Sequence, residues 1–165
     1  MQVVIVEDEC TEAEILEKYL DKFAEENNLQ ISHSRFSNGK EMLEKYQFTW
    51  DLILLDIEMP LMNGIEIARK IREKDSEVTI IFITQMAQYA IEGYSVNALD
   101  YVLKPVNYNM FAMKMRRAVH EFHMKQTDFI LLQKKSQKYK IPLKTLCYIE
   151  VYGHTIVYHT LEQEI

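Results

Sequence analysis

Short apolar runs alternate with amphipathic segments along the first three quarters of the chain. The apolar runs predict five strands, at 3–6, 29–36, 52–55, 78–83 and 100–103. Apolar residues at helical spacing predict helices between and after them, over 11–27, 42–46, 65–74, 87–93 and 107–125. Strands and helices that alternate in this way predict an α/β fold, a five-stranded doubly wound parallel sheet with helices on both faces.

Two local signals fix the expected ends of the first helix. Thr11 is followed three residues later by Glu14, a spacing typical of a capping box. The Asn27-Asn28 pair is expected to end the helix.

Polar residues stand where four of the predicted strands end. Glu7 and Asp8 follow the first strand, Asp56 the third, Thr84 the fourth and Lys104 the fifth. A doubly wound sheet binds its ligand at the carboxyl ends of its strands, so these residues predict one common site. The alternative, that Glu7 and Asp8 are ordinary solvated acids, stays open on their pattern alone.

The residue types at this site favour phosphoryl chemistry. Carboxylates close together repel one another unless a cation relieves them, and a set of oxygen ligands favours Mg²⁺. Asp56 can then stay ionised and act as a nucleophile towards phosphorus. Lys104 and the Thr84 hydroxyl would offset the charge on the phosphoryl oxygens.

The last 40 residues differ in charge and pattern. Residues 1–125 carry 14 Lys and Arg against 21 acidic residues, whereas residues 126–165 carry 5 Lys against 4. This second segment reads as short strands at 129–132, 139–142, 146–152 and 155–159, with a turn at Gly153-His154. We therefore expect two domains, 1–125 and a C-terminal all-β fragment, 126–165.

Composition excludes several other classes of protein. With 48% hydrophobic and 27% charged residues the chain can form a core, so disorder is not expected. Cys10 and Cys147 do not form a disulfide framework, and no signal peptide or membrane-spanning stretch is recognisable. The expected location is the cytoplasm, without membrane contact.

The motifs "VVIVEDE", "DLILLDIEMPLMNG", "IIFIT" and "ALDYVLKP" resemble those of response regulator receiver domains over residues 1–125. The resemblance implies a flavodoxin-like switch rather than an enzyme, phosphorylated on Asp56 by a sensor histidine kinase. It makes Asp8 and Asp56 Mg²⁺ ligands together with the Glu58 backbone carbonyl, and Glu7 a ligand through water. It also implies the residues that read the phosphoryl group, Thr84 and Lys104, a switch aromatic, Tyr101, and a cis peptide bond at Lys104-Pro105. Gln85 departs from the family, which commonly has a small residue there.

The segment "KYKIPLKTLCYIEVYGHTIVYHT" resembles the opening of a LytTR-type DNA-binding domain. This resemblance implies control of transcription through DNA bound by the complete effector domain, with His154 near a DNA-reading loop. Specific DNA binding is not expected of residues 126–165 alone. Their unpaired strands are expected either to pair with the same segment of a second molecule or to pack on the chain's own receiver. The first outcome, a homodimer, is favoured because helices already cover the sheet of the receiver.

Two other functions share part of this pattern. A Mg²⁺-dependent phosphohydrolase would also use an aspartyl nucleophile, as Asp56-Ile57-Glu58 suggests, but such enzymes place it on the first strand. A flavin- or nucleotide-binding module would need a Gly-rich turn after the first strand, which this chain lacks. Glu7-Asp8-Glu9 stand there instead and would repel phosphates. The five histidines show no spacing for zinc.

Overall fold

The computed structural model describes residues 1–89, 93, 95–127, 129–134, 137–153 and 155–161 of the 165. The chain divides into two compact units, Met1–Val119 and His120–Ile165, and each is described by itself. No helix within the described part of the chain combines the length and the apolar composition that crossing a membrane requires.

A five-stranded parallel sheet forms the centre of the first unit, in the order β2-β1-β3-β4-β5. The strands are β1 (Gln2–Val6), β2 (Ser32–Phe36), β3 (Leu52–Leu55), β4 (Thr79–Thr84) and β5 (Asp100–Leu103). The other elements are α1 (Cys10–Asn27), α2 (Gly39–Glu44), α3 (Gly64–Arg72), the 3₁₀ turn η1 (Ala87–Tyr89) and α5 (Tyr108–Thr127). The predicted fold class is confirmed.

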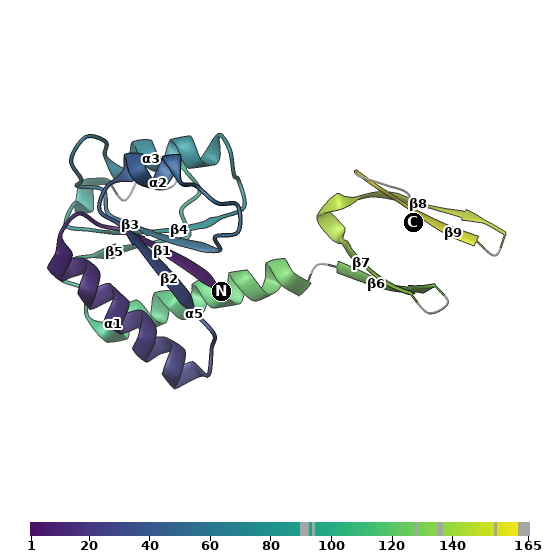
Figure 1. The fold of residues 1–165 in the computed structure, drawn as a ribbon, viewed down its shortest axis with the longest axis horizontal. Coiled ribbons are helices and arrows are strands. Elements are labelled where there is room, and N and C mark those ends of the chain that lie inside the picture. Colours follow the sequence, from purple (N-terminus) through teal and green to yellow (C-terminus); the bar gives the residue numbers. More distant parts are fainter. Residues whose placement is uncertain (90–92, 94, 128, 135–136, 154, 162–165) are drawn as a thin grey trace. The chain divides into compact units, whose positions relative to one another are not determined.

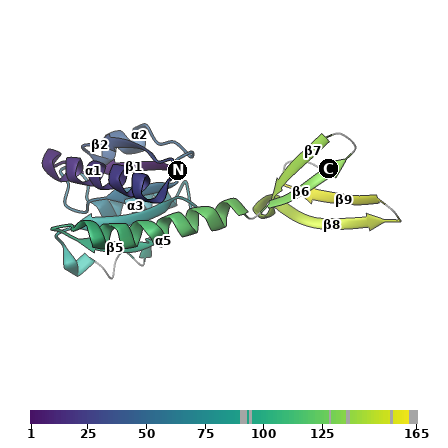
Figure 2. The same ribbon diagram turned by 90° about the horizontal axis from the view of Figure 1, so that it is seen from below.

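Helices cover both faces of the sheet, with α2 and α3 on one face and α1 and α5 on the other (Figures 1 and 2). The central strands β1, β3 and β4 are buried almost throughout, because side chains on both of their faces meet helices. Alternate residues of β3 show this: Ile53 belongs to the core under α2 and α3, and Leu54 to the core under α1 and α5.

The start of α1 differs from the sequence prediction. The helix begins at Cys10, so Thr11 lies inside its first turn, and the predicted capping box is wrong. The Thr11 hydroxyl donates a hydrogen bond to Glu9 Oε1 (3.0 Å) instead of capping the helix. The other end is as predicted: Asn28 takes a left-handed conformation (φ 51°) and ends the helix.

An aromatic cluster closes the core at the amino end of β3. Trp50, the sole tryptophan, is 9% exposed, and its ring lies 5.0 Å from that of Tyr46 and 5.7 Å from that of Phe36. The Tyr46 hydroxyl donates to Asp75 Oδ2 (2.9 Å), while Asp75 Oδ1 accepts from the Glu77 and Val78 N–H groups. These bonds tie the loop after α3 to the end of α2.

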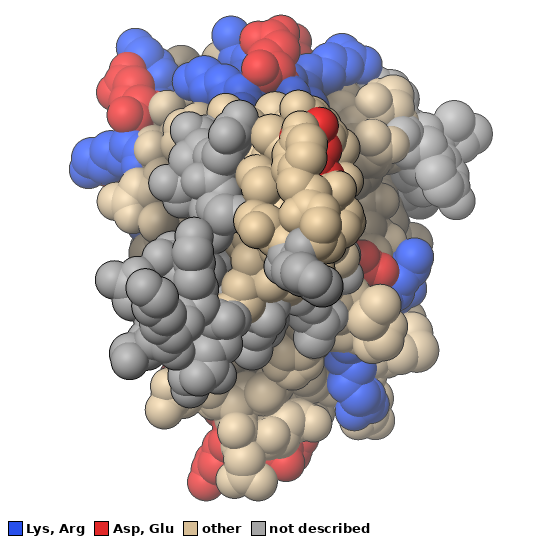
Figure 3. Space-filling view, turned by 90° about the vertical axis from the view of Figure 1, so that its right-hand side faces the viewer, with Lys and Arg blue, Asp and Glu red and all other residues tan. Residues whose placement is uncertain are grey.

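The second unit contains two antiparallel hairpins. Strand β6 (Phe129–Lys134) pairs with β7 (Gln137–Pro142), and β8 (Leu146–Tyr152) pairs with β9 (Thr155–Thr160). A short 3₁₀ turn, η2 (Leu143–Thr145), precedes β8. Much of the described surface that faces the viewer in Figure 3 is uncharged. The small antiparallel sheets agree with the β-rich character that the sequence predicts.

Candidate functional site

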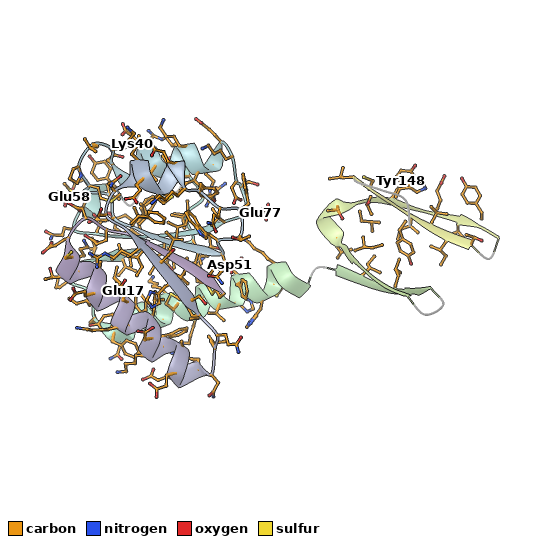
Figure 4. All side chains as sticks on the ribbon, in the orientation of Figure 1. Glu17, Lys40, Asp51, Glu58, Glu77 and Tyr148 are labelled. Atoms are coloured by element: carbon orange, nitrogen blue, oxygen red, sulfur yellow. The ribbon has the colours of Figure 1, made fainter. Side chains whose placement is uncertain are left out.

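The predicted site residues meet at one edge of the sheet. Glu7 and Asp8 follow β1, Asp56 follows β3, and β1 and β3 are neighbours in the sheet. This is the point where the strand order reverses, and the crevice there is the usual ligand site of such sheets. Figure 4 shows the polarity of β3: Asp51 before the strand and Glu58 after it lie at opposite ends of the sheet.

Lys104 joins the carboxylates of two strand ends. Its Nζ donates hydrogen bonds to Glu7 Oε2 (2.7 Å) and to Asp56 Oδ2 (2.8 Å). All three side chains are nearly withdrawn from solvent, with exposed fractions of 6%, 2% and 5% for Lys104, Glu7 and Asp56. Burial disfavours the Lys104 cation, but its bonds to Asp56 and Glu7 outweigh that and raise its pKa. The lysine therefore holds a positive charge against Asp56.

The Asp56 carboxylate is also held by the backbone that follows it. Its Oδ1 accepts hydrogen bonds from the N–H groups of Ile57 (2.6 Å) and Glu58 (3.1 Å). Gly64 lies against the same residue: a Cβ on it would be 2.1 Å from the Asp56 carbonyl oxygen. The loop between β3 and α3 therefore folds back onto Asp56, and it needs glycine at this position.

Three carboxylates are close enough to share a cation. One oxygen each from Glu7, Asp8 and Asp56 lie within 4.8 Å of one another, and Asp8 is exposed. Burial raises the pKa of Glu7 to about 7, against the lowering effect of the Lys104 bond, and the charge of Asp56 adds to the rise. Concentrated negative charge with oxygen donors only is what a hard divalent ion such as Mg²⁺ relieves, so this donor set fits the ion.

Thr84 and Tyr101 lie on neighbouring strands beside this site. The Thr84 side chain is fully buried, and its Oγ1 accepts a hydrogen bond from the Met86 N–H (3.3 Å). The Tyr101 hydroxyl donates to the Met86 carbonyl oxygen. Partial burial, with the charges of Asp56 and Glu58, raises the pKa of Tyr101 to about 12. The loop after β4 thus contacts both predicted switch residues.

The remaining predicted residues fall around these. Glu58 is exposed beside Asp56, and Gln85 is exposed after Thr84. The Lys104-Pro105 peptide bond is cis, as the resemblance to receiver domains implies. His154 and part of the predicted helix 87–93 lie outside the described residues. Among those described, the Glu7, Asp8 and Asp56 cluster is the one group of three or more His, Cys and acidic residues placed to share a metal.

Three backbone groups of the site were not predicted from the sequence. The N–H groups of Ile57 and Glu58 and the Met86 carbonyl leave no side-chain pattern, because every residue type except proline has the same backbone groups. The glycine in "MPLMNG" was the available signal for the tight return of this loop.

Residues 3–116 match the family model described as the response regulator receiver domain. The chain is 29% identical to the sensory transduction protein LytT of Oceanobacillus iheyensis over its full length, which is 69% of that protein. It is 30% identical to the positive alginate biosynthesis regulatory protein of Pseudomonas aeruginosa, with 72% of this chain and 47% of that protein covered. The chain spans about half the length of that regulator and of the NatR protein of Bacillus subtilis.

Solved structures show the same receiver fold. The response regulatory domain of protein mrkE from Klebsiella pneumoniae superposes with a TM-score of 0.68 at 27% identity, covering 75% of this chain and 99% of that one. The TrrA protein of Thermotoga maritima, solved in complex with Mg²⁺ and beryllium fluoride, gives a TM-score of 0.61 at 28% identity. It covers 71% of this chain and 97% of that one.

Proposed function

Because this chain belongs to the response regulator receiver family, we propose that it is the phosphoryl-accepting part of a transcriptional regulator with a LytTR-type effector. Receiver domains are signalling switches rather than enzymes, and the relatives named above are regulatory proteins. In this proposal residues 1–125 form the receiver and residues 126–165 begin the effector. A cytoplasmic sensor histidine kinase domain supplies the phosphoryl group.

The observation that carries the proposal is the hydrogen-bonded placement of Asp56. Its carboxylate is bonded to Lys104 and to two backbone N–H groups at the edge where Glu7 and Asp8 also lie. One Asp56 oxygen attacks phosphorus while the bond from phosphorus to the donor's histidine nitrogen breaks, and an acyl phosphate forms. Lys104 then lies beside the new phosphoryl oxygens and stabilises their charge.

The acidic cluster is where Mg²⁺ would be held. Asp8, Asp56 and the Glu58 carbonyl would bind it directly, and Glu7 would bind through a water molecule. The bound ion supplies positive charge that lets a phosphoryl group approach three carboxylates. Without the ion, Glu7 and Asp56 both accept hydrogen bonds from Lys104, and these bonds fix the lysine beside the acceptor.

Thr84 and Tyr101 would transmit the conformational change from the acceptor site to the surface of the receiver. When the Thr84 hydroxyl moves towards the phosphoryl group, it no longer accepts the hydrogen bond from the Met86 N–H. The loop then moves, and with it the Met86 carbonyl that accepts the hydrogen bond from Tyr101. The surface of β5 and α5 exposes Leu103, Met110 and Met113, at 45%, 41% and 52%. This face is our candidate for phosphorylation-dependent dimerisation.

The similarity to the transcriptional regulatory protein NatR of Bacillus subtilis supports a transcriptional role. Specific DNA contact, which we assign to the complete effector with His154 near one reading loop, is not expected of residues 126–165 alone.

Labelling tests the assignment of Asp56. After incubation with acetyl phosphate and Mg²⁺, mass spectrometry should find one phosphoryl group, on Asp56, and Asp56→Asn should remove it. Equal labelling of the variant would move the acceptor elsewhere.

A second variant tests the metal ligands. Asp8→Ala removes a carboxylate from the cluster, so Mg²⁺ binding measured by calorimetry and Mg²⁺-dependent labelling should both be lost. Glu14→Ala, an exposed acid further along α1, is the matched control and should keep both. An unchanged labelling rate in Asp8→Ala would contradict the proposed site.

A further inference from the structure

Helix α5 carries both accessible and protected methionines. Of the nine methionines, all within the described part of the chain, three have exposed side chains: Met110, Met113 and Met124, at 41%, 52% and 53%. Met115 on the same helix is only 1% exposed, because it faces the core under α1 and α5. Oxidants in solution therefore reach the thioethers of the first three residues before that of Met115.

Met110 and Met113 belong to a stripe of α5 that flanks the edge strand β5. Met110 stands four residues before Lys114, and residues four apart lie on the same side of a helix. Met113 stands in the same relation to Arg117. Lys114 and Arg117 pair with Asp100, the first residue of β5, at 2.7 and 3.1 Å. These ion pairs place the side of α5 that carries both methionines beside the edge strand.

The exposed end of β5 reaches the same stripe. Leu103 is three residues beyond Asp100, which is about 10 Å along the strand. Helix α5 runs back along β5, and Met110 lies about 6 Å along it from Lys114, towards the start of the helix. Leu103 and Met110 are therefore level to within about one helical turn. With Met113 they form one exposed apolar patch, next to charges that are already paired.

This patch is the face that we assign to phosphorylation-dependent dimerisation. In a two-fold dimer both copies use the same patch, so the contact buries the methionines of two chains. A thioether packs well against apolar surface because it is flexible and weakly polar. A sulfoxide carries a polar S=O group that loses its water on burial, and this loss opposes association.

We propose that Met110 and Met113 are a redox modification site, at which oxidation to methionine sulfoxide by a hydroperoxide prevents phosphorylated chains from dimerising. The thioether sulfur attacks one oxygen of hydrogen peroxide. The S–O bond forms as the O–O bond breaks, and the other oxygen leaves as water after proton transfer. Sulfur loses two electrons and the peroxide gains them. Methionine sulfoxide reductases reverse the modification. This role rests on the dimer face of the proposed function.

Sedimentation of the 165-residue chain tests the site. A Val151→Lys background places a charge on exposed β8, so that the second unit does not contribute to association. Beryllofluoride with Mg²⁺ serves as the mimic of the phosphoryl group. Hydrogen peroxide is applied and removed, and peptide mass spectrometry verifies sulfoxide at Met110 and Met113. The dimer Kd should then rise at least about tenfold, because polar groups are buried without partners.

Two further measurements separate this effect from general damage. The two methionine sulfoxide reductases, one for each sulfoxide epimer, should restore the original Kd. Labelling of Asp56 by acetyl phosphate should not change on oxidation, because the patch lies outside the acceptor site. Beryllofluoride added before the peroxide should slow oxidation of Met110 and Met113 but not of Met124, since only the first two become buried in the dimer.

Two variants control the result. Met110→Leu combined with Met113→Leu keeps an apolar patch without thioethers, so its dimer should survive peroxide. This variant retains Cys10 and Cys147, which are exposed, so it also controls for oxidation of thiols. Met124→Leu removes the exposed methionine near the end of α5, outside the patch, and should leave the sensitivity to peroxide intact.

Three results would overturn the inference. Sulfoxide at both positions could leave the dimer Kd unchanged, the double leucine variant could be as sensitive to peroxide as the parent chain, or the reductases could fail to restore association. A different outcome, no association of the untreated chain with beryllofluoride, would reject the proposed dimer face and the inference with it. Failure of acetyl phosphate to label Asp56 would reject the acceptor itself.

Discussion

Gly64 shows how one residue shapes the acceptor site. A Cβ here would meet the Asp56 carbonyl oxygen at 2.1 Å and the Ile57 Cα at 2.9 Å. Both obstacles are backbone atoms that cannot rotate away, and Asp56 is itself paired to β1 through its N–H and the Val6 carbonyl oxygen (3.0 Å). Glycine at this position lets α3 begin directly beside the acceptor.

Gly64→Ala should therefore destabilise the receiver unit by about 3 kcal/mol, the cost of forcing atoms into a packed site with fixed walls. Denaturant unfolding measures the difference. Gly93→Ala is the matched control: its added Cβ would meet Phe82 at 3.6 Å, an ordinary contact, so its effect should be much smaller. Equal effects of the two substitutions would contradict this account.

The side chains of the site could be predicted because strand ends are visible in the sequence. Asp56 and Lys104 each follow an apolar run, and the parallel sheet brings those ends together. The bond between Lys104 and Glu7, which fixes the lysine, follows from no sequence spacing, because the two residues are 97 positions apart. The left-handed conformation of Leu61 was also not predictable, because leucine rarely adopts it.

Among the elements, β5 and α5 are connected by an ion-pair network around Asp100. Lys114 Nζ lies 2.7 Å from one oxygen of Asp100, and an Arg117 guanidinium nitrogen lies 3.1 Å from the other. Burial opposes ionisation of Asp100, but the bonds from Lys114, Arg117 and the Tyr101 N–H outweigh it and lower its pKa. The network holds α5 against the edge strand of the sheet.

A lowered pKa makes this network sensitive to acid. The stabilisation is complete above the ordinary aspartate pKa near 4 and is lost as the pH falls through the lower pKa of the folded state. Asp100→Asn should therefore cost about 1 kcal/mol or less near pH 7, after allowance for solvent screening, and less still near pH 2. Urea unfolding at several pH values measures this, and a pH-independent difference would contradict it.

Element boundaries were predicted where the hydrophobic pattern was strong. The expected strands 52–55 and 100–103 match β3 and β5. Strand β2 is shorter than expected, Ser32–Phe36, because Leu29 and Ile31 pack against the core under α1 and α5 before pairing begins. Apolar residues indicate burial, and burial alone does not distinguish a strand from the loop that leads into it.

On the scale of the whole molecule, the described strands β8 and β9 of the second unit expose several large apolar side chains. On β8, Ile149 and Val151 are 46% and 66% exposed, and Ile156 on β9 is 51% exposed. Val151 pairs with Ile156 and Ile149 with Tyr158, so these residues share one face of the hairpin. Two-stranded hairpins are marginal by themselves, and such a face favours contact with another molecule.

We expect the intact, unphosphorylated chain to form dimers through this segment, by pairing with the same segment of a second copy. A chain cut after Lys125 should be monomeric in sedimentation at the same concentration. Val151→Lys in the intact chain should act in the same direction, because a charge on the apolar face opposes its burial. If the intact chain were as monomeric as the shortened one, intermolecular pairing would be rejected.

The fold class could be read from the sequence because alternating strands and helices permit few topologies. The turn between β8 and β9 was also predicted, from Gly153, which takes a left-handed φ of 58°. Local sequence patterns do not predict which surface packs against the exposed face of β8 and β9, because that packing depends on contacts between distant segments.

The position of Trp50 has a practical consequence for optical spectroscopy. As the sole tryptophan, buried at the amino end of β3 beside Tyr46, it reports on the core of the receiver unit from the opposite end of the strand to Asp56. Its emission should shift to longer wavelength when that core opens to water, while the second unit contributes tyrosine signal alone. A fluorescence melt of the intact chain would therefore follow the first unit selectively.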